Sequence, residues 1–211
     1  MIAVLILIAY LLGSIPTSVW IGKAFYNIDV REFGSGNAGA TNTFRVLGKS
    51  AGIPVLIIDI LKGSAAVALA WFSGFTNQSD EFINLQLGLG VAALLGHIFP
   101  VFAGFRGGKG VATILGIVVC IVPVSCSLSL VVFLIMLFST RIVSLSSMCA
   151  GVSFPIILNL ILGNDNPILT VFSVVVAILL LITHRKNIQR LVKKQESKVQ
   201  LFSQRELRIK N

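Results

Sequence analysis

Apolar residues occur along the chain in six long runs, which polar or glycine-rich breaks separate. Most of these runs approach the roughly 20 apolar residues that a helix needs to cross a bilayer. They cover residues 2–21, 53–72, 85–103, 111–138, 142–162 and 168–183. This pattern predicts an all-α integral membrane protein built from spanning helices.

The fourth run is longer than one span requires, and Pro123 lies near its middle. It forms either one kinked helix or two short helices that turn at the proline. Two helices place all but one of the 17 basic residues on one face of the membrane. One helix would export Arg141 and the cationic tail, although Lys and Arg tend to remain cytoplasmic. The sequence therefore predicts seven transmembrane helices, some of them short, with the N-terminus outside (periplasmic) and the C-terminus inside (cytoplasmic).

The composition excludes a soluble globular domain. Hydrophobic residues make up 55% of the chain and charged residues only 12%, against about 45–50% and about 25% in soluble domains. The topology explains the formal net charge of +9, so we expect no nucleic-acid partner. The three cysteines lie in apolar stretches without regular spacing, and no carboxylates or Cys/His sets cluster in the sequence. We therefore expect neither disulfides nor a metal site.

The one basic residue outside that charge pattern is Lys62, which lies inside the second run and follows Asp59 by three residues. At this spacing two side chains share a helix face and can form an ion pair. A charged pair within the membrane is either a functional site, here at the floor of a cytoplasm-facing cavity, or a structural pair that orients helices.

The first inner loop, residues 33–45, is rich in glycine and in neutral hydrogen-bond donors. Three glycines fit the G-x-G-x-x-G pattern, but no strand precedes them, so a dinucleotide-binding fold is rejected. Glycines still let backbone N–H groups approach an anion, and an arginine adds a bidentate donor. The loop therefore predicts an anion site rather than a flexible connection. Its candidate residues are Gly34, Ser35, Gly36, Asn37, Gly39, Thr41, Asn42 and Arg45.

The second inner loop ends in a glycine-rich turn that leads into a helix at Val111. A Walker A loop would require glycine at position 103 and Ser or Thr at position 110, where the chain has Ala103 and Gly110. Free N–H groups and the helix dipole at such a turn favour phosphate. We expect phosphate binding without nucleotide hydrolysis; the alternative is a pair of cations that serves topology alone. The candidates are Gly107, Gly108, Lys109 and Gly110.

The third polar segment follows the last apolar run. His184, Asn187 and Arg190 are spaced by three residues and form one polar stripe on a helix, beside Arg185. All three clusters fall on the same predicted face of the membrane. Phosphorylated ligands that enter from the cytoplasm are therefore expected. His97, inside an apolar run, is either a hydrogen-bonded packing residue or a catalyst.

In order along the chain, these segments resemble the motifs of the bacterial acyl-phosphate:glycerol-3-phosphate acyltransferases. The resemblance covers residues 1–196, which are interpreted as one seven-span domain, and leaves 197–211 as a basic cytoplasmic tail. It rests on residues 34–42, 59–63, 96–113 and 184–191. The chain differs from the usual family pattern at Ala38, where proline is common, and at Lys194, where glycine usually stands two residues before the glutamate, here Glu196. The role of Glu196 is left open.

The resemblance implies transfer of a fatty acyl group from acyl phosphate to the sn-1 hydroxyl of glycerol 3-phosphate, which yields lysophosphatidic acid and inorganic phosphate. It also implies seven spans in the bacterial inner membrane, with the active site facing the cytoplasm. The residues implied to hold substrate phosphates during catalysis are Ser35, Arg45, Lys109, His184 and Asn187. Those expected to contribute to substrate binding are Gly34, Gly36, Asn37, Gly39, Thr41, Asn42, Lys62, His97, Gly107, Gly108, Gly110 and Arg185.

Acyl phosphate is an activated anhydride, so the enzyme's tasks are to bring two anions together and to stabilise charge at the carbonyl. We expect no cofactor. The H-x-x-x-x-D dyad of other acyltransferases is absent, because Phe102 and Gln189 stand five residues after the two histidines. Either His184 is the general base or a substrate phosphate accepts the hydroxyl proton, and we favour the phosphate. Further expected partners are membrane lipids and the enzyme that makes acyl phosphate. The alternative function is a small membrane transporter of an organic phosphate.

Overall fold

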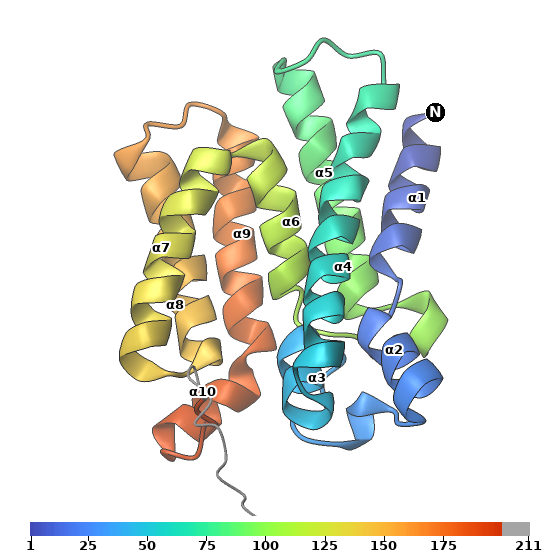
Figure 1. Ribbon diagram of the computed structural model, residues 1–211. Helices are drawn as coiled ribbons and strands as arrows, with labels where there is room; N and C mark the ends of the chain where they lie inside the picture. Colours follow the sequence, from blue (N-terminus) through green and yellow to red (C-terminus); the bar gives the residue numbers. More distant parts are fainter. Residues whose placement is uncertain (200–211) are drawn as a thin grey trace, which may run out of the picture.

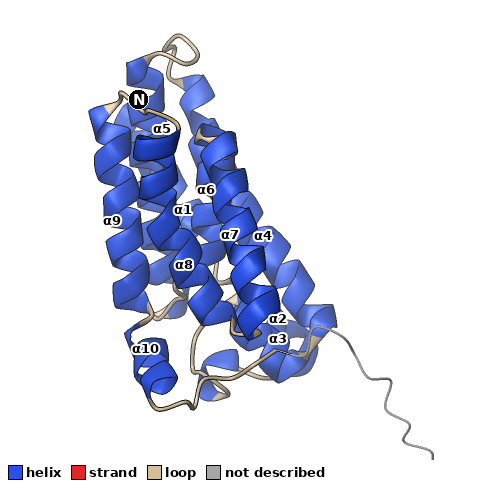
Figure 2. Ribbon diagram, turned by 90° about the vertical axis from the view of Figure 1, so that its left-hand side faces the viewer, coloured by secondary structure: helices blue, strands red, loops and turns tan. Residues whose placement is uncertain are grey.

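The computed structural model describes residues 1–199 as a bundle of helices, and no strand occurs in that range (Figures 1 and 2). This architecture confirms the prediction of an all-α chain. The α-helices are α1 (Ile2–Gly13), α2 (Thr17–Tyr26), α3 (Ala40–Leu47), α4 (Lys49–Ala68), α5 (Asp80–Ile98), α6 (Val111–Ile121), α7 (Pro123–Thr140), α8 (Val143–Ile156), α9 (Pro167–Thr183) and α10 (Arg185–Val192). Short turns are η1 (Val30–Glu32), η2 (Leu69–Phe72), η3 (Val101–Ala103) and the π-helical η4 (Ile157–Ile161).

Two prolines divide apolar runs into separate helices. Helix α6 ends at Ile121 and α7 begins at Pro123, so the predicted break in the fourth run is confirmed. The apolar run over residues 2–21 is also divided, because α1 ends at Gly13 and α2 begins at Thr17, with a bend of 41° between them. Pro16 precedes α2 and lacks the N–H that a continuous helix would use.

The helices have the length and apolar character of a membrane protein. Within residues 1–199, four helical segments are long and apolar enough to cross a bilayer, or up to six if each of two bent pairs forms one span. The four segments are Lys49–Phe72, Asp80–Ala103, Pro123–Thr140 and Val143–Ile161. Helix α6, with 11 residues, is a shorter apolar helix. The number of seven spans therefore stays a prediction.

Glycines bring four of the helices into close contact. Helix α1 packs on α5 and α4 packs on α6. A Cβ at Gly96 of α5 would overlap the carbonyl oxygen of Tyr10, and one at Gly116 of α6 would overlap that of Ile60. Small residues of this kind let backbones approach closely inside a membrane. The end of α1 is thereby held against the last turn of α5.

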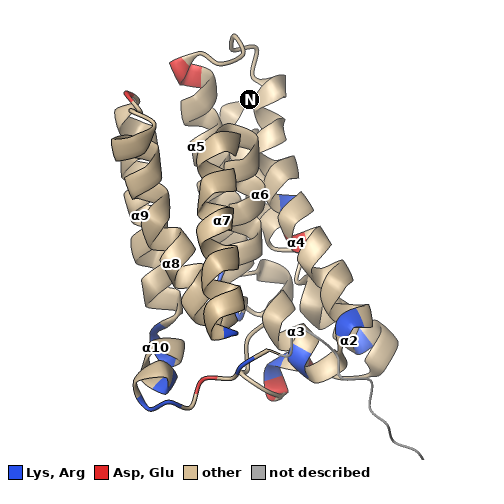
Figure 3. Cartoon of the chain, turned by 60° about the vertical axis from the view of Figure 1, so that its left-hand side comes forward, with Lys and Arg blue, Asp and Glu red and all other residues tan. Residues whose placement is uncertain are grey.

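Charged residues are divided between the two ends of the bundle. In Figure 3, Lys and Arg gather at the end where α2, α3 and α10 lie, whereas acidic residues occur both among them and on the loops at the opposite end. The three polar segments singled out in the sequence connect helices at the cationic end. The fold therefore brings these segments together although they are far apart in the chain (Figure 1).

Candidate functional site

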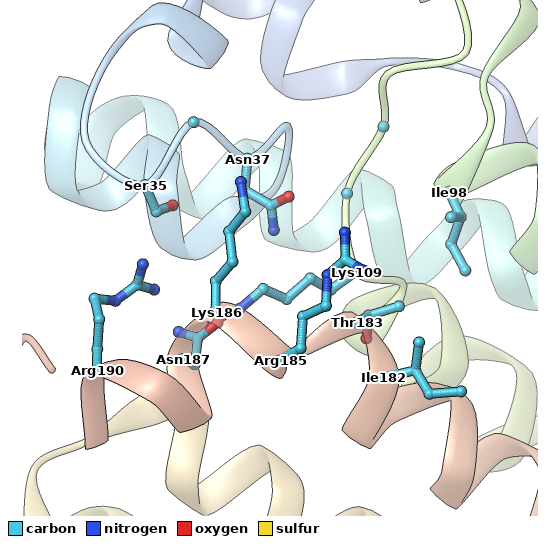
Figure 4. Close-up of a pocket in the computed structure, with 13 residues that line it drawn as sticks. Ser35, Asn37, Ile98, Lys109, Ile182, Thr183, Arg185, Lys186, Asn187 and Arg190 are labelled. Carbon is cyan, nitrogen blue, oxygen red and sulfur yellow. Dashed lines mark hydrogen bonds between the residues drawn. The ribbon is translucent and has the colours of Figure 1, made fainter. Parts of the chain in front are cut away.

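The three polar segments line one pocket at the cationic end of the bundle. Its volume is about 400 Å³. Each of the three segments contributes residues to its wall, and Figure 4 shows Lys109 and Lys186 reaching into the space between α10 and the first loop. The lining residues are Ser35, Gly36, Asn37, Ile98, Gly107, Gly108, Lys109, Ile182, Thr183, Arg185, Lys186, Asn187 and Arg190.

The buried side chain of Asn42 holds the first loop in shape. Its Oδ1 accepts hydrogen bonds from the backbone N–H of Ser35 at 2.8 Å and from the Ser35 hydroxyl at 3.1 Å. Its Nδ2 donates to the carbonyl oxygens of Val30 and Phe33 at 2.7 and 3.1 Å. Gly34, at φ +61°, provides the left-handed turn between these contacts. Asn42 therefore fixes Ser35 at the pocket wall without lining the pocket itself.

The second loop folds back against the end of α5. The N–H groups of Gly107 and Gly108 each donate at 3.1 Å, to the carbonyl oxygens of Ile98 and His97 respectively. These bonds direct the chain so that the next residue, Lys109, extends across the pocket. Its Nζ donates to Oδ1 of Asn187 on α10.

A contact that the sequence did not predict joins the segment before the first loop to the second loop, through an arginine held in an ion pair. Arg31 donates to the carbonyl oxygen of Ala103 at 2.8 Å, while Asp29 accepts from the Arg31 Nε and Nη2 at 2.9 and 2.7 Å. The hydrogen bond from Arg31 outweighs burial and holds the pKa of Asp29 well below its usual range. The spacing of two residues between Asp29 and Arg31 was the available signal, although it does not predict the hydrogen bond to the Ala103 carbonyl oxygen.

The environment of Lys109 makes its ammonium group easier to deprotonate. Burial, with smaller contributions from Arg190 and Arg45, lowers the pKa of Lys109 from 10.5 to about 8, and Glu196 partly opposes this shift. A phosphate that binds beside the ammonium would stabilise its charged form.

His184 occupies the bend of 59° between α9 and α10. Its Nδ1 lies 2.8 Å from the carbonyl oxygen of Leu180. Burial, reinforced by the charge of Lys109, lowers the pKa of His184 to about 4, so the ring is neutral at physiological pH. A neutral ring that donates from Nδ1 to Leu180 keeps Nε2 as an acceptor.

The carboxylate of Glu196 folds back onto the third segment. It accepts hydrogen bonds from Asn187 Nδ2 and Arg190 Nε, both at 2.6 Å, and from the Ser144 hydroxyl at 2.8 Å. Burial acts to raise the pKa of Glu196, but these bonds outweigh it and leave the pKa below its usual value. The turn before it places Lys194 at φ +56°, a conformation that glycine adopts more readily. Glu196 thus orients Asn187 and Arg190 from outside the pocket lining.

The structure brings some of the predicted site residues into the pocket wall and leaves others around it. Those in the wall are Ser35, Gly36, Asn37, Gly107, Gly108, Lys109, Arg185 and Asn187. Those outside the lining are Gly34, Gly39, Thr41, Asn42, Arg45, Lys62, His97, Gly110 and His184. Lys186 lines the pocket and was missed; its position beside Arg185 in the first turn of α10 was the available signal. Within residues 1–199, no three His, Cys, Asp or Glu side chains gather as metal ligands would.

Comparison with known proteins gives matches over nearly the whole chain. Residues 3–194 match the family described as glycerol-3-phosphate acyltransferase. A glycerol-3-phosphate acyltransferase of Enterococcus faecalis is 45% identical, over 99% of this chain and 96% of the relative. One of Listeria monocytogenes is 46% identical, over 92% of this chain and 94% of the relative.

Two solved structures share the fold. Both are crystal structures of PlsY (YgiH), an integral membrane glycerol 3-phosphate acyltransferase. The glycerol 3-phosphate form superposes with a TM-score of 0.85 at 37% identity, covering 94% of this chain and 96% of the other. The lysophosphatidic acid form gives a TM-score of 0.81 at 36% identity, covering 94% and 95%.

Proposed function

This chain belongs to the glycerol-3-phosphate acyltransferase family, and on that premise we propose that it transfers a fatty acyl group from acyl phosphate to the sn-1 hydroxyl of glycerol 3-phosphate. The products are lysophosphatidic acid and inorganic phosphate. Acylation of glycerol 3-phosphate follows from the family. The choice of acyl phosphate as donor rests on the resemblance of the motifs and on the chemistry of the pocket.

One observation carries this proposal: the pocket wall combines four cationic side chains with donors from three segments. The cations are Lys109, Arg185, Lys186 and Arg190, and no Asp or Glu of residues 1–199 is among the lining residues. Two phosphorylated substrates repel each other, and a wall of this kind offsets that repulsion. Apolar Ile98 and Ile182 lie beside the cations, where the start of an acyl chain can pack.

In the proposed reaction the substrate hydroxyl oxygen attacks the acyl carbonyl carbon. An ester C–O bond forms, the bond between that carbon and the phosphate oxygen breaks, and phosphate departs. Lys109 and the N–H groups of the glycine-rich turn stabilise the departing phosphate. Ser35, Arg45, His184 and Asn187 complete the set of groups that we assign to the substrate phosphates, and the loop glycines with Asn37, Thr41, Asn42 and Arg185 shape the site around them.

A substrate phosphate is the better acceptor for the hydroxyl proton. His184 has a pKa of about 4, whereas the second pKa of a phosphate monoester is about 6. The phosphate is thus the stronger base, and it is already beside the reacting hydroxyl. We therefore assign the proton to the phosphate, with His184 as a neutral neighbour of the reacting groups.

The wider arrangement follows from the charge distribution. We assign residues 1–196 to one seven-span domain in the bacterial inner membrane, with the N-terminus outside and the pocket facing the cytoplasm. The assigned cytoplasmic tail, 197–211, lies mostly outside the described residues. A soluble glycerol 3-phosphate and a lipid-like acyl phosphate would then meet at the inner surface, where the enzyme that makes acyl phosphate can supply its product.

The test is direct. Purified full-length protein in detergent is incubated with acyl phosphate and glycerol 3-phosphate, and released inorganic phosphate and lysophosphatidic acid are measured. We expect equal amounts of both products, and neither when one substrate is omitted. A transporter of an organic phosphate would release no phosphate above background. Activity with acyl-CoA but not with acyl phosphate would overturn the choice of donor while leaving acyl transfer intact.

A further inference from the structure

A charged cluster is buried where α4 packs against the break between α1 and α2. Asp59 and Lys62 of α4 are 2% and 5% exposed. Lys62 Nζ lies 2.8 Å from Asp59 Oδ1 and donates to the carbonyl oxygen of Ile15 at 2.9 Å. The hydroxyl of Thr17 donates to the same Asp59 oxygen at 3.1 Å. The pair therefore ties α4 to the break between α1 and α2.

His97 lies between this ion pair and the second loop of the pocket. It is 6% exposed, and its Nδ1 is 3.9 Å from Asp59 Oδ1. The other edge of the ring faces Gly108, because a Cβ at Gly108 would overlap Nε2 of His97. The carbonyl oxygen of His97 also accepts the N–H of Gly108 at 3.1 Å. His97 thus contacts Gly108 through both its side chain and its backbone.

The first loop also approaches Gly108, on the side where a side chain would point. A Cβ at this position would lie 2.6 Å from the carbonyl oxygen of Ala38, so glycine alone fits between Ala38 and the His97 ring. The next residue is Lys109. A movement of Gly108 toward the helices would therefore carry Lys109 out of its contact with Asn187.

Charges in the interior of a membrane protein are costly, and they are retained where they serve a function. Lys62 is directed at Asp59 and the Ile15 carbonyl oxygen, and the His97 ring lies against Gly108, so we look for their role in support rather than in contact with substrate. We propose that Asp59, Lys62 and His97 are positioning residues, which brace the glycine-rich loop from behind so that Lys109 is held at the depth where it meets substrate phosphate. This inference rests on the proposed function and adds to it a support built into the membrane-spanning helices.

The position of Lys109 can be read from its titration. Groups facing it are Asn187 and Arg190 of α10, His184 at the bend, Arg45 of α3 and Glu196. Burial is the main reason that its pKa is lowered to about 8. If the loop loses its support, Lys109 gains water, and its pKa rises toward the ordinary 10.5. A purely structural role of the cluster would reduce stability without this shift.

The experiment measures the dissociation constant for glycerol 3-phosphate by calorimetry between pH 7 and pH 10, with the full-length protein in detergent. For His97→Ala we expect binding at pH 7 to weaken about tenfold or more, and the loss of affinity at alkaline pH to begin at least about one pH unit later. His97→Phe keeps a flat ring beside Gly108 and should remain within about threefold of the parent. Ser18→Ala removes a buried hydroxyl of α2 that has no partner among residues 1–199, and it should change neither quantity.

A second variant keeps the proposal testable if His97→Ala does not fold. Asp59→Asn with Lys62→Met removes both charges and leaves no unpaired ion, and we expect the same two changes in a weaker form. Folded variants with the parent's affinity and alkaline profile would overturn the proposal, as would a His97→Phe variant as weak as His97→Ala. Because the readout is binding, a parent that binds glycerol 3-phosphate but transfers no acyl group would contradict the proposed function alone.

Discussion

Lys109 donates a hydrogen bond from Nζ to Oδ1 of Asn187, a residue 78 positions further along the chain. Asn187 in turn donates from Nδ2 to Glu196 at 2.6 Å, so its amide is oriented from both sides. The contact joins the glycine-rich loop to α10 across the pocket. It places a buried cation where the first, second and third polar segments meet.

Replacing Lys109 removes that cation. We expect Lys109→Gln to lower kcat/KM by about 100-fold or more, since stabilisation of the departing phosphate is lost. Initial rates of lysophosphatidic acid formation at varied concentrations of each substrate give this value. The matched control is Lys23→Gln, which neutralises a cation outside the pocket lining that forms a 3.4 Å ion pair with Asp29. A Lys109→Gln enzyme with the parent's kcat/KM would contradict the assignment.

The pH dependence should show the titration of the same group. The pKa of Lys109 is lowered to about 8, so its charge is present below that pH and is lost as the pH rises through it. We expect kcat/KM, which reports groups of the free enzyme, to fall above about pH 8. Lys109→Arg keeps its charge at these pH values. An alkaline fall that persists unchanged in Lys109→Arg would show that another group titrates.

His184→Gln separates the two possible proton acceptors. If a substrate phosphate takes the proton, the variant should bind glycerol 3-phosphate more weakly and retain a substantial kcat, with a loss of about tenfold or less. Calorimetry and saturation kinetics measure the two effects independently. Abolished turnover with unchanged binding would instead identify His184 as the general base.

Glu196→Gln should shift the pH above which affinity for glycerol 3-phosphate is lost, in the direction opposite to the shift in His97→Ala. The Glu196 charge raises the pKa of Lys109, so its removal lowers that pKa and the loss of affinity begins at lower pH. Ser144→Ala is the control, because it deletes one 2.8 Å hydrogen bond to Glu196 and leaves the charge in place. If affinity in Glu196→Gln is lost at the same pH as in the parent, the carboxylate acts only through the orientation of Asn187.

The packing of α4 on α6 is tested by a glycine substitution. Gly116→Ala places a Cβ against the carbonyl oxygen of Ile60, and overpacking of this kind typically lowers the free energy of unfolding by about 1–3 kcal/mol. A thermal melt in detergent measures the loss. Gly88→Ala on α5 has open space around its Cβ and should melt with the parent. Equal melting temperatures for both variants would contradict the close contact.

The helical architecture could be predicted from the sequence, because apolar runs and their prolines act locally. Pro123 ends one helix and begins the next, as expected. The break at Pro16 was missed because apolar residues continue on both sides of it, so the run looks uninterrupted. Asp59 and Lys62 form the ion pair that their spacing indicates, at 2.8 Å.

The site was predictable as three segments but not as a set of contacts. Glycines and cations identify each loop, yet no periodicity shows that Asn42 points inward to hold Ser35 or that Arg31 reaches Ala103. These contacts depend on how α4 and α5 place the loops relative to one another. For the same reason, the sequence could not show that Lys62 and His97 lie behind the pocket rather than in its wall.

The most direct measurement is a structure of this protein with glycerol 3-phosphate bound. The account predicts that the phosphate lies within hydrogen-bond distance of Lys109 Nζ and of at least one donor from residues 35–37 and one from residues 183–190. A phosphate bound at another place, or held by a single segment with Lys109 turned away, would contradict the shared pocket.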